Sequence, residues 1–203
     1  MKATVKRNLM LEFIPDKFEV PVEVNLNRVL MLNNKEIKDG QIVYLMSREL
    51  RLEDNWGLLF AFNLAKKNKR ELKVIISLEE KIYSKRQLDW MNNGLNVLKK
   101  NLVNNNISCE ISQVDLYFEN IGALVVDFNP VNLKTDLAKN VDFAVFEVDS
   151  HNIIPARYIS DKQEFSAATM RRKVYLNIGE FLTEFPKVFD VQKNEAFLNL
   201  EKF

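Results

Sequence analysis

The sequence predicts a doubly wound α/β fold, a five-stranded parallel sheet with helices on both faces. Short apolar runs rich in β-branched residues recur along the chain, and stretches with helical spacing separate the first three of them. Runs that are apolar throughout are typical of parallel strands buried on both faces. This alternation of strands and helices favours a parallel sheet over an antiparallel one.

The composition is that of a globular, cytoplasmic protein. The chain has 203 residues, of which 47% are hydrophobic and 28% charged, with a net charge of +1. This balance excludes a disordered chain and excludes nucleic-acid binding by bulk charge alone. One Cys and one His exclude a disulfide framework and a Cys/His zinc cluster. No apolar run is long enough to span a bilayer, and no glycine-rich phosphate loop is present.

The first part of the chain predicts an extended arm, followed by a strand and a helix. Residues 1–40 lack a sustained helical period and are interpreted as an extended N-terminal arm. The apolar run 42–46 predicts the first strand, and Asp54 or Asn55 then caps a helix, because a short side-chain oxygen accepts orphan backbone N–H groups. The apolar positions of that helix are Leu58, Leu59, Phe62 and Ala65.

A second strand–helix–strand unit follows. The runs 73–78 and 107–112 predict strands, and residues 85–100 between them predict a helix. One face of that helix carries Leu88, Met91, Leu95 and Leu98. Trp56 and Trp90 fall on the predicted helices, where packing is the default use of a tryptophan.

The runs 123–128 and 142–149 predict the fourth and fifth strands. The segments leading into them are short for parallel crossovers, which usually need about a dozen residues or more. We therefore expect helices of one or two turns, or a reduced edge. Ser160 predicts the cap of a helix that ends near residue 172, with Gln163 reaching back to it. The α/β domain is predicted to span 41–172.

The remaining residues, 173–203, are predicted to form a C-terminal tail. Phe181, Phe185 and Phe189 recur every four residues, and on a helix they form one apolar stripe. Pro186 is expected to split that helix into two pieces. We expect the tail to dock on the domain or on a partner, because burying three phenylalanines offsets much of the entropy lost on ordering.

Polar side chains gather where the predicted strands end, which is where open parallel sheets bind ligands. Arg48 and Arg51 follow the first strand and could hold an anionic group, or pair with neighbouring acids. Asp127 and Asp149 end adjacent strands, where they could serve acid/base or metal chemistry, or tie down the next loop. His151 has no Ser or Cys partner at a recognisable spacing, so we expect it to be structural.

Taken together, these segments resemble the N-terminal α/β domain of class II cyclobutane-pyrimidine-dimer DNA photolyases, in the photolyase/cryptochrome family. The segment 27–59 is similar to the family pattern of an arginine-led extended segment, a D-G turn, a strand and then R-D-x-R-x-x-D-N-W-A-L. The segment 125–130 is similar to V-V-D-F-S-P, and 148–174 to V-D-A-H-N-I-V-P followed by S-x-K-x-E-[YF]-x-A-x-T-[IM]-R. The first segment departs from its pattern at Glu49, where the family has Asp, and at Gly57, where it usually has Ala. The matches cover about residues 25–175.

The resemblance implies a Rossmann-like domain associated with light-dependent repair of cyclobutane pyrimidine dimers. In the family a larger helical domain holds FAD, and the 31 residues after Arg172 are too few for it. We therefore expect FAD only in a C-terminal domain missing from this chain, so that the chain is not a catalytic lyase by itself. The expected partners are a FAD-domain polypeptide or a second copy, with DNA bound weakly at most and no membrane contact.

The resemblance also implies either a deazaflavin-type antenna or no pigment. The candidate antenna cleft consists of Met46, Ser47, Arg48, Arg51, Asp127, Phe128, Asn129 and Asp149. The motif residues expected to be structural are Asp54, Asn55, His151 and Asn152. Two other functions stay open: a non-enzymatic interaction module, and a nucleotide-binding sensor derived from the same fold.

Overall fold

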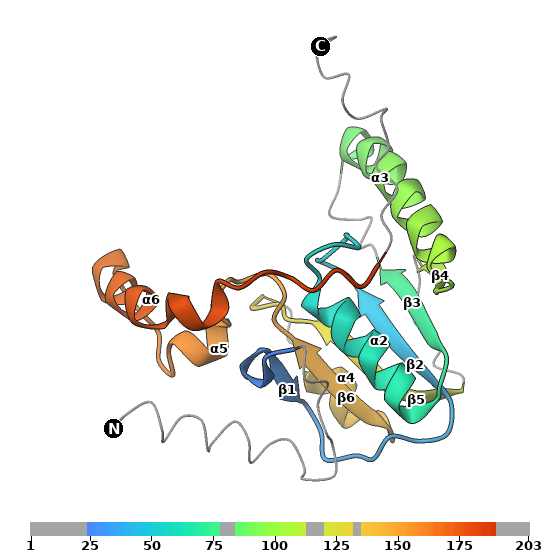
Figure 1. The fold of residues 1–203 in the computed structure, drawn as a ribbon, viewed down its shortest axis with the longest axis horizontal. Coiled ribbons are helices and arrows are strands. Elements are labelled where there is room, and N and C mark those ends of the chain that lie inside the picture. Colours follow the sequence, from blue (N-terminus) through green and yellow to red (C-terminus); the bar gives the residue numbers. More distant parts are fainter. Residues whose placement is uncertain (1–23, 78–83, 113–119, 132–134, 190–203) are drawn as a thin grey trace.

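A computed structural model describes residues 24–77, 84–112, 120–131 and 135–189. They form a mixed α/β structure in which helices flank one six-stranded, mostly parallel sheet (Figure 1). The predicted fold class is confirmed. Residues 1–23 of the predicted arm and 190–203 of the predicted tail lie outside the described residues.

The strand order of the sheet is β1-β6-β5-β2-β3-β4, and only β1 runs antiparallel, against β6. The strands are β1 (Val29–Met31), β2 (Gln41–Met46), β3 (Leu72–Ser77), β4 (Ser108–Ser112), β5 (Ile121–Asp127) and β6 (Ala144–Val148). The five predicted strands are all present. The sixth, β1, lies inside the predicted arm, and its three residues are too short to show a period of two.

Helices lie on both faces of the sheet. They are α2 (Trp56–Asn68), α3 (Lys85–Asn104), α4 (Thr135–Lys139), α5 (Ala156–Ile159) and α6 (Ala167–Phe181), with a 3₁₀ turn η1 (Leu26–Arg28) before β1. α2 and α3 pack on one face and α4 on the other. α4 is little more than one turn long, as the short crossover between the fourth and fifth strands predicts.

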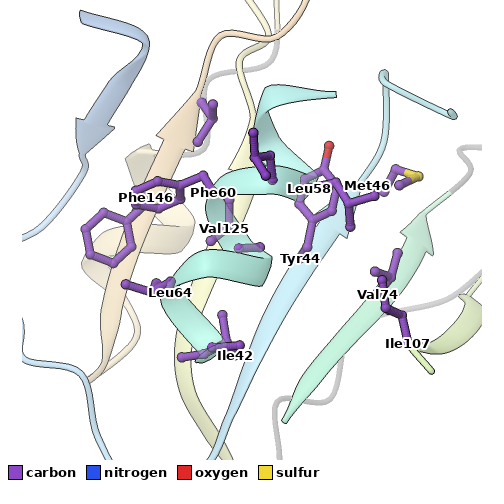
Figure 2. Packing of buried hydrophobic residues seen from close by; sticks show 14 of the residues in the cluster. Ile42, Tyr44, Met46, Leu58, Phe60, Leu64, Val74, Ile107, Val125 and Phe146 are labelled. Atoms are coloured by element: carbon purple, nitrogen blue, oxygen red, sulfur yellow. The ribbon is translucent and has the colours of Figure 1, made fainter. Parts of the chain in front are cut away.

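The larger part of the core lies between the sheet and α2. Ile42, Tyr44 and Met46 of β2 point to the same face because side chains alternate along a strand, and Leu58 and Leu64 of α2 pack on that face (Figure 2). All five are at most 4% exposed. Val43 and Leu45 of the same strand are buried in the second core cluster, with α4, so β2 is covered on both faces.

The prediction that Ser160 caps the last helix of the domain is wrong. Ser166 is the N-cap of α6 and accepts a hydrogen bond from the Thr169 backbone N–H, so α6 begins at Ala167. The predicted end near residue 172 is also wrong, because α6 continues to Phe181. Ser160 instead donates to Glu164 Oε1 at 2.9 Å and receives a hydrogen bond from Lys173 Nζ at 2.8 Å. The hydrogen bond from Lys173 lowers the pKa of Glu164 to about 2.

The described part of the tail docks on α2, but not as a helix beyond Phe181. Residues 182–189 are extended and cross the outer surface of α2 (Figure 1). Phe185 meets Trp56 edge to face with ring centroids 4.6 Å apart, and Phe189 meets Phe62 at 5.3 Å. Docking is therefore confirmed for residues 182–189, and the helical stripe is not.

Candidate functional site

The loops that follow β2, β5 and β6 meet at the carboxyl edge of the sheet. The chain leaves β2 toward β3 on one side, whereas β5 and β6 lie on the other side of β2. The strand order therefore reverses between β2 and β5, and ligands of open α/β sheets bind beside such a reversal.

Asp127, at the end of β5, is buried and holds the β2–α2 loop through hydrogen bonds. Its Oδ2 accepts backbone N–H groups from Ser47 and Arg48, each at 2.8 Å, and from Glu49 at 3.2 Å. The Tyr44 hydroxyl donates to Oδ1. Burial first, and the Asp127 carboxylate second, raise the pKa of Tyr44 well above its ordinary value. Because four donors already occupy this carboxylate, it ties down the loop.

Asp149 does the same for the loop that leaves β6. Its Oδ1 accepts the backbone N–H of Asn152 at 3.1 Å, and its Oδ2 accepts that of Ala156 at 2.7 Å. The Asn152 side chain also donates to both carboxylate oxygens at 3.0 Å. Of the two uses considered for Asp127 and Asp149, tying down loops is the one that their contacts show.

Arg28 also holds this loop, and it was not among the predicted site residues. Its guanidinium donates to the backbone oxygens of Asp149, Asn152 and Ile153 at 3.0, 2.8 and 2.6 Å. It also lies 5.1 Å from the centroid of the Trp56 ring. Burial lowers the pKa of Arg28 to about 10. Its position in a segment without periodicity gave no signal of these contacts.

The loop between β2 and α2 is closed by Asn55, one of the two residues predicted to cap the helix. Asn55 Oδ1 accepts the Leu58 backbone N–H at 2.9 Å, and its Nδ2 donates to the backbone oxygens of Glu49 and Arg51. Asp54 instead takes a left-handed backbone conformation with φ of 49°. The loop is thus rigidly shaped by its own side chains.

The two predicted arginines are both anchored in this loop. Arg48 Nη1 donates to the Phe128 backbone oxygen at 2.9 Å. Arg51 forms an ion pair with Glu49, and its Nη2 donates to the Asp54 and Ser150 backbone oxygens at 3.0 and 3.3 Å. Both side chains therefore have defined orientations at this edge.

An open groove of about 320 Å³ separates this loop from the first half of α3. Arg48, Leu50 and Arg51 form one wall, and Trp90, Met91, Gly94 and Leu95 of α3 form the other. Trp90 is 73% exposed, so the expectation that it packs in the core is wrong. A Cβ on Gly94 would meet nothing within 4 Å, which leaves the α3 wall open.

Only Arg48 and Arg51 among the eight predicted cleft residues line this groove. Met46 is fully buried in the core (Figure 2). Asn129 Oδ1 accepts the Val131 backbone N–H at 3.0 Å. The α3 residues were missed, although one signal was present: Trp90 lies off the apolar stripe formed by Leu88, Met91, Leu95 and Leu98.

The groove lining combines two arginine side chains with an exposed tryptophan ring. Ligand sites typically enclose about 300–1,000 Å³ and combine apolar walls with a few polar groups.

Among the described residues, no cluster of three or more His, Cys, Asp or Glu side chains could hold a metal ion. In the same ranges, no helix is both long and apolar enough to cross a membrane.

Comparisons with known proteins point to one family. Residues 42–117 match the sequence profile of the family described as DNA photolyase. Deoxyribodipyrimidine photo-lyase from Potorous tridactylus is 35% identical over 72% of this chain and 30% of the relative. The proteins of the same name from Arabidopsis thaliana and Oryza sativa subsp. japonica are 33% and 32% identical, each over 73% of this chain and 33% of the relative.

These similarities are to DNA photolyases, and the mixed α/β sheet is consistent with the Rossmann-like fold expected of a photolyase N-terminal domain. The chain spans about a third of the length of the curated relatives it matches.

Proposed function

We propose that this chain serves as the N-terminal α/β domain of a class II photolyase-type system for light-dependent repair of cyclobutane pyrimidine dimers. The observation that carries the proposal is the similarity to three photo-lyases over about three quarters of the chain. In this proposal the flavin chemistry belongs to the part of the relatives that these residues do not span. The role of this chain is to dock with that part and to support it.

We further propose that the groove beside Arg48 and Arg51 binds a deazaflavin-type antenna. A planar ring can stack on Trp90, whose indole is largely exposed. The two guanidinium groups can donate to carbonyl or anionic ring edges. When bound, such a pigment supplies light absorption, and the residues of this chain only bind and orient it.

Absorbance and fluorescence titration with a reduced deazaflavin test the antenna proposal. Gly94→Phe fills the groove from α3 and is expected to weaken binding at least about tenfold, because the ring would occupy the ligand volume. Gly179→Phe is the matched control, since Gly179 is also helical with open space around it but lies on α6. Failure of the unmodified chain to bind the pigment would overturn the antenna proposal.

The repair proposal is tested with a chimera. This chain replaces the part of the Potorous tridactylus relative that it matches, and light-dependent repair of dimer-containing DNA is measured. We expect repair by the chimera and none by this chain with added FAD. A folded, FAD-loaded chimera without repair would favour the alternative of an interaction module. Pigment-independent binding of a nucleotide in the groove would favour the alternative of a sensor.

A further inference from the structure

Glu49 is a buried carboxylate with no role in the proposed function. It stands in the β2–α2 loop with a side-chain exposure of 1%. Burying a carboxylate is costly unless the charge is paired and hydrogen-bonded. Glu49 has two partners at this depth: Arg51 Nη1 forms an ion pair with Oε2, and His151 Nδ1 lies 3.0 Å from Oε1.

The ion pair fixes the direction of the Arg51 guanidinium. Glu49 holds Nη1, while the backbone oxygens of Asp54 and Ser150 hold Nη2. The guanidinium is thus hydrogen-bonded to two backbone oxygens and ion-paired with Glu49, yet the side chain stays 43% exposed and lines the groove. A cation kept in place before a ligand arrives loses less side-chain entropy on binding.

The second partner connects the groove wall to the loop after β6. The ionised Glu49 carboxylate can only accept, so His151 donates from Nδ1. Ser150, next to His151, accepts the Gly57 backbone N–H on its Oγ at 2.7 Å. The β2–α2 loop is therefore joined to the loop after β6 by Glu49 with His151 and by Arg51 with Ser150, and the first turn of α2 is joined to it through Gly57.

We propose that Glu49 is a positioning residue that orients Arg51 for an anionic group of a planar aromatic ligand in the groove. The proposal rests on the proposed ligand site but not on the identity of the pigment. His151 supports Glu49 from the second loop. The ligand class follows from the lining, which combines the Arg48 and Arg51 cations with the exposed Trp90 ring.

A double-mutant cycle tests this role with anilinonaphthalene sulfonate, a fluorescent aromatic anion, as the probe. Glu49→Gln keeps the size of the side chain and removes its charge, and we expect about tenfold weaker binding, the size of effect of one charge-assisted contact. Glu49→Asp keeps the charge and should stay within about threefold of the unmodified chain. In an Arg51→Ala background, Glu49→Gln should change the affinity no further.

The outcomes separate this inference from the antenna proposal. Equal effects of Glu49→Gln with and without Arg51 would overturn the positioning role, because Glu49 would then act through general stability. Probe binding that Gly94→Phe does not weaken, or no probe binding at all, would overturn it as well. Probe binding that follows the expected cycle, in a chain that fails to bind a reduced deazaflavin, would support the positioning role and overturn only the antenna proposal.

Discussion

The two halves of the sheet differ in how firmly their carboxyl ends are held. β5 and β6 are buried along their whole length, and Asp127 and Asp149 tie the loops that follow β2 and β6. On the other side, β4 contains only exposed and half-buried residues, and the first half of α3 contains no buried residue. The rigid half, with β5 and β6, positions the arginines through its buried carboxylates. The looser half, with β4 and α3, leaves room for a ligand.

Asp127→Ala should have the largest effect on stability, because it removes the buried carboxylate that holds the β2–α2 loop. Four donors lose their acceptor in a buried site, so we expect a loss of about 4 kcal/mol in the free energy of unfolding. Denaturant unfolding measures it. Asp136→Ala on α4, where an exposed carboxylate pairs with Lys139, is the control and should change stability by less than about 0.5 kcal/mol.

Leu102→Ala should destabilise the protein by about 3 kcal/mol, the usual size for a buried leucine that leaves a cavity. Leu102 is fully buried near the end of α3, whereas Leu88 near its start is only half-buried. Leu88→Ala should therefore cost clearly less in the same thermal or denaturant measurement. Equal losses would contradict the contrast between the two ends of α3.

Tyr44→Phe should cost about 1–2 kcal/mol by removing the hydroxyl that donates to Asp127. It should also change the response to alkali. The folded-state pKa of Tyr44 lies well above the ordinary value of 10.0, so the neutral hydroxyl contributes stability that is fully present below pH 10 and lost as the pH rises further. The stability difference between the two proteins should shrink above that pH, and a constant difference would refute the linkage.

Trp90→Ala should have the smallest effect on stability, less than about 0.5 kcal/mol, because the side chain is 73% exposed. The same change should remove the stacking surface of the groove and weaken binding of an aromatic anion. Trp56→Ala is the contrasting variant, since Trp56 packs against Phe185 and Arg28 and should lower the melting temperature. A strongly destabilised Trp90→Ala protein would show that the first half of α3 is not loose.

The sequence by itself determined the elements whose signal is local. Apolar runs marked five of the six strands, and Asn55 was one of two candidate caps because a cap bonds to a residue three positions away. The same local argument misplaced the start of α6. Ser160 has the residue type of a cap, but its hydroxyl bonds to Glu164 and Lys173 in the folded chain.

Tertiary structure decided which of the charged residues meet. Arg28 reaches the backbone of Asp149 across 121 positions, and Glu49 reaches His151 across 102. Trp90 joins the arginines in one groove only because α3 extends beside the carboxyl end of β2. Residue type shows that an arginine or a carboxylate needs a partner, since a buried charge is costly. Which partner it finds depends on the strand order and on the path of the loops. The periodicity of the sequence predicts neither the strand order nor the loop paths.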